Sequence, residues 1–182
     1  MTPATKPPPT QFGCLGSVDG GFIALGVREF LSIGTAGGLQ PDLAPVTSCS
    51  VRAPFVTRGP RIIVRRPEVE ATPDARLTEE PAGSIRAAGL AVRRGVSWTI
   101  DTPHRETAAE AKHYQHRGVL CVEMEAAALF TVAAHRGASI AAAFCVSDSL
   151  ADAEWNPSFD HPQLAHNLLA LFGAAVDVAR IE

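Results

Sequence analysis

The stretch that most constrains the fold of this chain covers residues 119–150. Residues 119–122 are a short apolar run, residues 124–136 are rich in strong helix formers, and residues 139–146 are apolar again. Gly137 follows the helical segment, at the position where glycine most often ends a helix. We therefore predict a strand, a helix and a second strand, which form a right-handed unit with parallel strands.

Acidic side chains follow both predicted strands. Glu123 and Glu125 come after the first strand, and Asp148 comes after the second. Parallel strands end at the same edge of a sheet, where open α/β sheets bind ligands, so we expect three carboxylates and Met124 to meet in one crevice. Each carboxylate also has a purely structural interpretation. The two glutamates could lie at the positive end of the helix dipole, and Asp148 could cap a turn.

A glycine-rich segment at residues 34–39 follows another predicted strand, residues 30–33. Small residues let the backbone approach a ligand closely, and successive N–H groups with the Thr35 hydroxyl could hold an anion or a sugar hydroxyl. The spacing matches neither the dinucleotide-binding fingerprint nor a P-loop. We predict a turn here, with an ordinary tight turn as the alternative to a binding loop.

Composition excludes several classes of protein. A chain of 182 residues with 46% hydrophobic and 19% charged residues suits one ordinary α/β domain. The net charge of −3 favours neither nucleic acid nor an anionic membrane. The basic cluster has no aromatic stacking platform beside it, so it fits a solvated strand face; it consists of Arg52, Arg58, Arg61, Arg65 and Arg66.

The four cysteines have neither metal-ligand nor disulfide-framework spacing, so we expect no metal site. His113 and His116 share a predicted helix but lack a third ligand, and we expect them on the surface. Without an apolar leader or a membrane-length apolar run, the chain is expected to be cytoplasmic.

The domain is expected to cover residues 22–182. Residues 1–21 are rich in proline and glycine and are expected to be disordered or irregular. Within the domain, Pro81 and Gly83 should interrupt a helix at residues 74–88. Asp160 should be the N-cap of a final helix that has Pro162 in its first turn.

Four segments resemble the nucleoside phosphorylase family, which includes purine nucleoside phosphorylases, uridine phosphorylases and methylthioadenosine nucleosidases. Residues 122–130 and 146–150 carry the closest resemblance. Residues 30–39 resemble the family's glycine turn, and residues 98–107 resemble the segment that leads to its base pocket. The resemblance implies a three-layer α/β/α fold with a mixed central sheet, N-terminal strands that are reduced or missing, and a homo-oligomer.

The resemblance also implies roles for individual residues. Asp148 would be the catalytic residue, donating a proton to N7 of a purine, with Ser147 orienting it. Glu125 would accept hydrogen bonds from the ribose 2′- and 3′-hydroxyls, Met124 would pack against the sugar, and Glu123 would support them.

Two further positions complete the expected site. Thr35, with Gly34 beside it, matches a position that contacts phosphate or the sugar. His104 stands where relatives often have an aromatic side chain near the base. Inorganic phosphate would be the co-substrate, with no other cofactor, no metal, no nucleic acid and no membrane partner.

The sequence departs from the family in the half of the site that holds the nucleophile. The phosphate-binding loop of Gly-Asp-Pro type is not found, and Ser32 stands where many phosphorylases have an arginine. We expect phosphorolysis of a purine-type nucleoside to the free base and ribose 1-phosphate. The alternatives are a hydrolytic nucleosidase of the methylthioadenosine type and a homologue with impaired catalysis.

Overall fold

The computed structural model describes residues 20–44, 46–56, 72–87, 89–100, 104, 106–152 and 155–180. Most of the segment expected to be irregular, residues 1–19, lies outside the described residues. The same holds for Arg58, Arg61, Arg65 and Arg66 of the basic cluster, whereas Arg52 is exposed on a strand. No helix among the described residues combines the length and the apolar character needed to cross a membrane.

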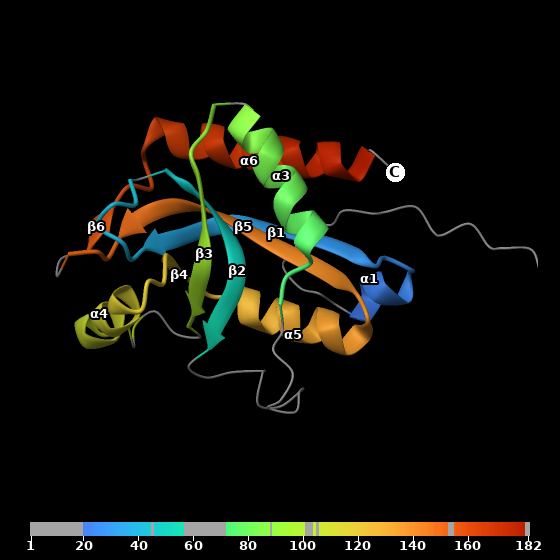
Figure 1. Ribbon diagram of the computed structural model, residues 1–182, viewed down its shortest axis with the longest axis horizontal. Helices are drawn as coiled ribbons and strands as arrows, with labels where there is room; N and C mark the ends of the chain where they lie inside the picture. The colour runs from blue at the N-terminus through green and yellow to red at the C-terminus, as the bar shows by residue number, and fades with distance from the viewer. Residues whose placement is uncertain are drawn as a thin grey trace, which may run out of the picture.

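The described residues form an α/β fold with a mixed sheet, as predicted (Figure 1). The helices are α1 (Gly20–Ala24), α3 (Ala75–Ala87), α4 (Ala108–His116), α5 (Ala126–Arg136) and α6 (Pro162–Arg180). The strands are β1 (Glu29–Gly38), β2 (Ser48–Val56), β3 (Val92–Thr99), β4 (Cys121–Glu123), β5 (Ser139–Ser149) and β6 (Asn156–Pro157).

The sheet closes on itself. Its strand order is β1-β4-β3-β2-β5-β6, and β1 also pairs with β5. The pairs β1–β5, β2–β3 and β3–β4 are parallel, whereas β1–β4, β2–β5 and β5–β6 are antiparallel. The resulting ring of five strands has β6 added along the end of β5.

The predicted parallel unit around α5 is wrong. The strand, helix and strand exist, and Gly137 ends α5 in the left-handed conformation with φ 67°. However, β1 lies between β4 and β5, antiparallel to the first and parallel to the second. A local apolar pattern identifies strands but not their partners. The ten-residue β1 offers β5 a much longer ladder than the three-residue β4 could.

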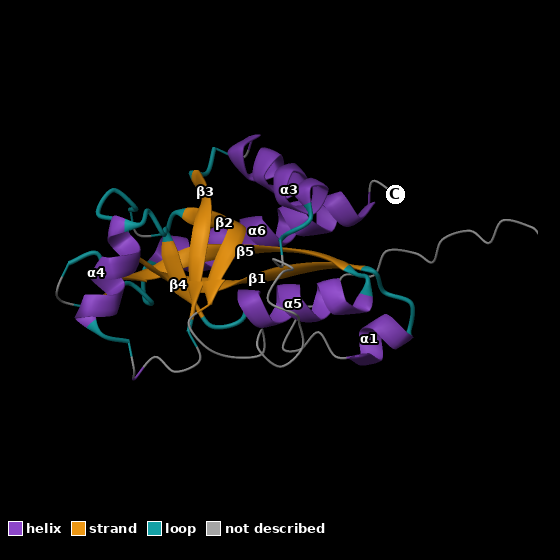
Figure 2. Cartoon of the chain, turned by 60° about the horizontal axis from the view of Figure 1, so that its bottom comes forward, coloured by secondary structure: helices purple, strands orange, loops and turns teal. Residues whose placement is uncertain are grey.

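Strand β5 divides the core by its two-residue period. Ile140, Ala142, Phe144 and Val146 pack with α1 and α5 in one cluster. Ala141 and Cys145 face the opposite way, toward α3 and α6. Figures 1 and 2 show this arrangement, with α3 and α6 on one side of the sheet and α1 and α5 on the other.

Two helix predictions need correction. Helix α3 is continuous although Pro81 lies inside it. Pro81 is on the buried face of the helix, as are Leu77 and Ile85, and burial of this face offsets the lost backbone hydrogen bond. Helix α6 begins at Pro162, as expected, but His161 rather than Asp160 caps it. The Nδ1 atom of His161 accepts a hydrogen bond from the Gln163 N–H at 3.1 Å. The sequence did not predict this cap, because aspartate is a more usual N-cap residue than histidine.

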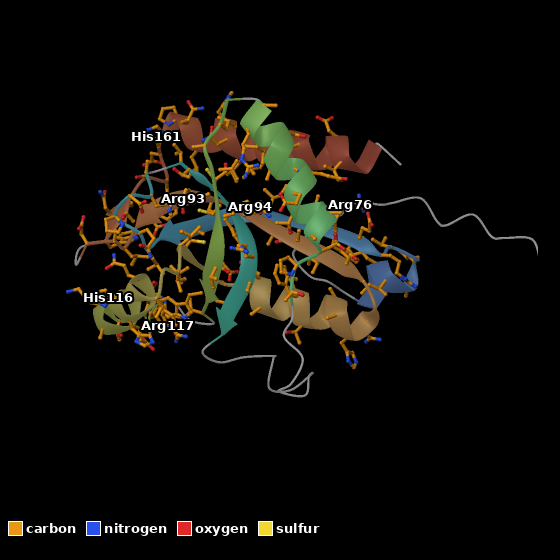
Figure 3. All side chains as sticks on the ribbon, viewed as in Figure 1. Arg76, Arg93, Arg94, His116, Arg117 and His161 are labelled. Atoms are coloured by element: carbon orange, nitrogen blue, oxygen red, sulfur yellow. The ribbon has the colours of Figure 1, made fainter. Side chains whose placement is uncertain are left out.

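Three arginines labelled in Figure 3 link elements at the surface. Arg76 joins α3 to Glu29 of β1, Arg94 joins β3 to Glu79 of α3, and Arg93 pairs with Asp42. These pairs are partly or largely exposed, so each contributes little to stability. His113 and His116 are exposed on α4, as predicted, and Figure 3 labels the second.

Candidate active site

A cleft of about 630 Å³ lies at the carboxyl ends of β1 and β5. Six of the residues assigned to a site from the sequence line it: Thr35, His104, Glu123, Met124, Ser147 and Asp148. Gly34 and Glu125 are not among its lining residues. The predicted convergence therefore occurs, although the strand arrangement that was expected to cause it does not.

Strand β1 brings the site together. The predicted turn at residues 34–39 is wrong, because β1 continues to Gly38, with a register irregularity between Ala36 and Gly37. Gly37 pairs with Val122 of β4 on one side and with Asp148 of β5 on the other. The glycines allow a close approach of strands and side chains here, so the ends of β4 and β5 meet across β1.

No side chain would fit at Gly37 without movement of its neighbours. A Cβ atom there would lie 2.6 Å from Cδ1 of Leu150, 3.1 Å from Cγ1 of Val122 and 3.2 Å from Oδ2 of Asp148. The glycine that the sequence suggested for a ligand-binding turn therefore serves close packing beside the cleft.

Asp148 is held from both sides. Ser147 Oγ donates to Oδ1 at 2.7 Å, and the indole Nε1 of Trp155 donates to Oδ2 at 2.9 Å. Ser147 is itself buried, and its hydroxyl also lies 3.5 Å from the carbonyl oxygen of Ala36 on β1. The Ser147–Asp148 contact expected from the sequence is present. Two donors fix the carboxyl group at the edge of the cleft.

Glu123 is a buried acceptor. Ser97 Oγ donates to its Oε1 at 3.2 Å, and Thr99 Oγ1 donates to the same oxygen. The N–H groups of Glu125 and Ala126 donate to its Oε2 at 2.8 and 2.6 Å. Burial raises the pKa of Glu123 above its usual 4.5, while the hydrogen bonds from Thr99 and the two N–H groups oppose that rise. The side chain thus fixes the first turn of α5 to β3.

Met124 and Glu125 lie between Glu123 and α5. Met124 is 44% exposed and lines the cleft. Glu125 is the exposed N-cap residue of α5, and its side chain makes no capping hydrogen bond. Its carboxylate is therefore not engaged by the helix and is accessible to a ligand.

The far wall of the cleft comes from the segment before α4. Thr107 and Glu110 form a capping box that fixes the start of α4. Tyr114 of α4 stacks on Trp98 of β3, with ring centroids 4.5 Å apart. Gln115 donates to the carbonyl oxygens of Leu39 and Ala151 at 2.7 and 2.8 Å. These contacts hold α4 against the ends of β1 and β5.

Among the lining residues that the sequence did not assign to the site, three have an acidic or aromatic side chain: Glu106, Trp155 and Phe159. Glu106 belongs to the segment that resembles a base pocket, which was a signal for it. Trp155 lies outside the four segments that carry the family resemblance. Strand β6 pairs antiparallel with β5, with Pro157 opposite Asp148, so the chain turns back along the end of β5. This turn places the indole of Trp155 beside Asp148. No sequence pattern indicated that return.

The site is rich in acids and poor in cations. Among the described residues that line the cleft there is no lysine or arginine, and His104 is the one side chain able to become cationic. The described part of the chain also contains no group of three or more His, Cys, Asp or Glu side chains that could hold a metal ion. A carboxyl group that is held in place at such a cleft, as that of Asp148 is, can accept a proton from a bound molecule or donate one to it.

A family model described as "Phosphorylase superfamily" matches residues 21–179. The chain belongs to this superfamily. The match covers nearly the whole described domain, and it confirms the resemblance seen in the four sequence segments. The mixed α/β fold agrees with it.

Curated relatives narrow the likeness within the superfamily. The chain is 30% identical over 131 residues, 71% of its length, to "Purine nucleoside phosphorylase DeoD-type" of Caldanaerobacter subterraneus subsp. tengcongensis, covering 56% of that protein. A protein of the same name from Alkaliphilus metalliredigens is 30% identical over 127 residues, 69% of this chain and 54% of that one. The Bacillus cereus (strain B4264) protein of that name is 28% identical over 156 residues, 85% and 65% of the two chains. The chain therefore matches about half to two thirds of the length of these relatives.

Proposed function

We propose that this phosphorylase-superfamily chain binds a purine-type nucleoside in the cleft and cleaves its glycosidic bond, with inorganic phosphate as the attacking group. The products would be the free base and ribose 1-phosphate. The observation that carries the proposal is the fixed position of Asp148, between Ser147 and Trp155, in a cleft that Met124 and Thr35 also line. The purine preference rests on the relatives' names and on the Ser147–Asp148 pair.

In this proposal Asp148 hydrogen-bonds N7 of the base and passes a proton to it as the bond to the sugar breaks. The electron pair of that bond moves to the base, and a proton on N7 makes the departing base neutral. A positioned acid of this kind contributes about 10²- to 10⁴-fold to a rate. Ser147 and Trp155 are the positioning residues, because they hold the carboxyl group through its two oxygens.

The sugar would lie at the start of α5. Met124 offers an exposed apolar side chain to one face of the ribose, and the free carboxylate of Glu125 would accept from its hydroxyls. Glu123, with its oxygens occupied by backbone and hydroxyl donors, supports this turn rather than contacting the sugar. His104 would contact the base from the opposite wall.

Phosphate would approach from β1. Thr35 is exposed within β1 and lines the cleft, so its hydroxyl is available to an anion or a sugar hydroxyl, and Gly34 precedes it. No metal ion is required in this proposal, because the departing base is neutralised by a proton.

Hydrolysis is the second candidate, and the cleft itself favours considering it. Phosphate is a doubly charged nucleophile that is usually bound by cations or aligned N–H groups. Ser32, at the position where many phosphorylases have an arginine, is buried in β1. None of the described lining residues is a lysine or arginine. Water needs no such partner.

The test uses the purified chain with inosine, uridine and methylthioadenosine, each with and without inorganic phosphate. Release of free base that requires phosphate, with formation of ribose 1-phosphate from inosine, is the expected result. Equal release without phosphate would replace phosphorolysis by hydrolysis. Binding of a nucleoside without release of its base would make the chain a non-catalytic homologue, and neither binding nor release would overturn the proposal.

We also propose a cytoplasmic location and a homo-oligomer. Cys49, Cys121 and Cys145 are free buried thiols, as is usual in a reducing compartment. Leu169 and Phe172 of α6 are 71% and 53% exposed, an apolar surface that a second copy would cover. Light scattering of the purified chain tests the second proposal, and a monomer at all concentrations would contradict it.

A further inference from the structure

Glu106 lines the cleft but has no part in the proposed function. It precedes α4 and is partly buried. Its Oε1 atom is buried and has no hydrogen-bond partner among the described residues. A buried carboxylate oxygen without a donor loses its hydrogen bonds to water, and no protein hydrogen bond replaces them. This environment therefore favours the protonated form of the Glu106 carboxyl group.

Asp148, in the same cleft, has the opposite environment. Both of its oxygens accept hydrogen bonds, Oδ1 from Ser147 and Oδ2 from Trp155. The cleft therefore holds one carboxyl group with a donor on each oxygen and one with a buried oxygen that has no donor among the described residues.

The charges around Glu106 act in the same direction. Burial raises the pKa of Glu106 above its usual 4.5, and the charge of Asp148 and then that of Glu110 raise it further. Asp148 comes from β5 and Glu110 from α4. His104 on the same segment and Glu123 from β4 are the other titratable groups that line the cleft. Two carboxyl groups whose environments differ in this way are the usual mark of an acid and its charged partner.

We propose that Glu106 and Asp148 act as a carboxyl pair, in which Glu106 holds the proton before a nucleoside binds and Asp148 passes that proton to the bound base. This inference rests on the proposed function for its chemical consequence. When a nucleoside binds, the proton passes from the Glu106 carboxyl group through Asp148 to N7 of the base. Sequence reasoning assigned the acid to Asp148 alone.

The step is balanced in atoms and charge. The bond between C1′ of the sugar and N9 of the base breaks, and its electron pair remains with the base. The base gains the proton at N7 and leaves neutral. An oxygen of inorganic phosphate forms the new bond to C1′. In the hydrolytic alternative the oxygen of water forms this bond, and the water releases one proton to solvent. Glu106 becomes a carboxylate and is protonated again from solvent before the next turnover.

The direct test is a titration that needs no activity. Side-chain carboxyl ¹³C signals are followed against pH in the full chain labelled at glutamate, and Glu106→Gln identifies the Glu106 signal. We expect Glu106 to titrate above the range of exposed glutamates. Asp148→Asn should lower its pKa, because the neighbouring negative charge is removed, and Glu110→Gln should lower it less.

The proposed pair would be wrong if the Glu106 signal titrates like that of an exposed glutamate. It would also be wrong if the pKa of Glu106 is the same in Asp148→Asn as in the wild type. This readout stands even if the chain cleaves no nucleoside, in which case the proposed function fails and the titration still decides whether the pair exists.

Kinetics test the delivery of the proton. With the acid on Glu106, kcat/KM should be constant at low pH and fall as pH rises through the raised pKa of Glu106. Glu106→Gln should lose this alkaline limb and lower kcat/KM about 100-fold at pH values below it. Glu110→Gln, which keeps a side chain able to complete the capping box, should keep the limb. If the wild type is active and Glu106→Gln has the same kcat/KM and the same pH profile, Glu106 does not deliver the proton to the base.

Discussion

The indole Nε1 of Trp155 donates a 2.9 Å hydrogen bond to Oδ2 of Asp148, seven residues earlier in the chain. Strand β6 makes this possible, because it pairs back along the end of β5. Trp155 is 60% exposed and lies beside Phe159, with ring centroids 6.2 Å apart. One side chain thus positions the proposed acid and extends the aromatic wall of the cleft.

Replacing Trp155 with phenylalanine tests the positioning role. Trp155→Phe keeps an aromatic ring but removes the donor to Asp148, so Oδ2 is released. A hydrogen bond to a charged group contributes about 1.5–3 kcal/mol, and exposure places this one at the low end. We expect kcat/KM for base release to fall about 10-fold.

Trp155→Ala is the comparison for this variant, because it removes the ring as well. If the hydrogen bond carries the effect, the alanine variant should lose little more in kcat and should differ mainly in KM. A phenylalanine variant with wild-type kcat/KM would show that Ser147 alone suffices to position Asp148.

Gly37 should be intolerant of a side chain. In Gly37→Ala the new methyl group would meet Leu150, Val122 and Asp148 at 2.6–3.2 Å, and these neighbours must move. We expect a loss of about 1–3 kcal/mol in the free energy of unfolding, measured by urea denaturation, together with reduced base release. The activity should fall because Asp148 is one of the displaced groups.

Gly83→Ala is the matched control. Gly83 lies within α3, and a Cβ atom there would have no neighbour within 4 Å. Alanine should stabilise the helix by about 0.5–1 kcal/mol and leave activity unchanged. Equal effects of the two substitutions on the free energy of unfolding would contradict the packing described around Gly37.

Glu123 and Glu125, two residues apart, should respond differently to the same change. Glu123→Gln replaces a buried acceptor of four hydrogen bonds, so the free energy of unfolding should fall by about 1–3 kcal/mol. Glu125→Gln alters an exposed carboxylate with no capping bond and should change it by less than about 0.5 kcal/mol. Its effect should appear in the KM for ribonucleosides. A destabilised Glu125→Gln with normal KM would reverse the assignment.

Much of the fold followed from the sequence, because apolar runs and helix signals are local. Residues 119–150 do form a strand, a helix and a strand, and Gly137 does end the helix. Strand partners are set by distant parts of the chain, and the insertion of β1 between β4 and β5 was therefore missed. The glycines of β1 were correctly read as a sign of close approach. The close neighbours are side chains of other strands and the residues that follow them, however, and not a ligand bound by a turn.

The site divides in the same way. Ser147 and Asp148 are adjacent in sequence, and their contact was predicted. Trp155 reaches Asp148 only through the β5–β6 pairing, and Glu106 comes under the charge of Asp148 only because both residues line one cleft. Both depend on tertiary contacts that no local pattern encodes. The roles of the six predicted lining residues stay predictions.

The role of Asp148 as the group that passes a proton to the base is tested by release of free base from inosine in the presence of phosphate. The rates of wild type, Asp148→Asn and Asp152→Asn are compared. Asp152 is an exposed aspartate four residues away and outside the described cleft lining, so it receives the same chemical change without contact with the site. We predict that Asp148→Asn lowers the rate by about 10²- to 10⁴-fold. Asp152→Asn should match wild type. Base release by Asp148→Asn at the wild-type rate would contradict the account.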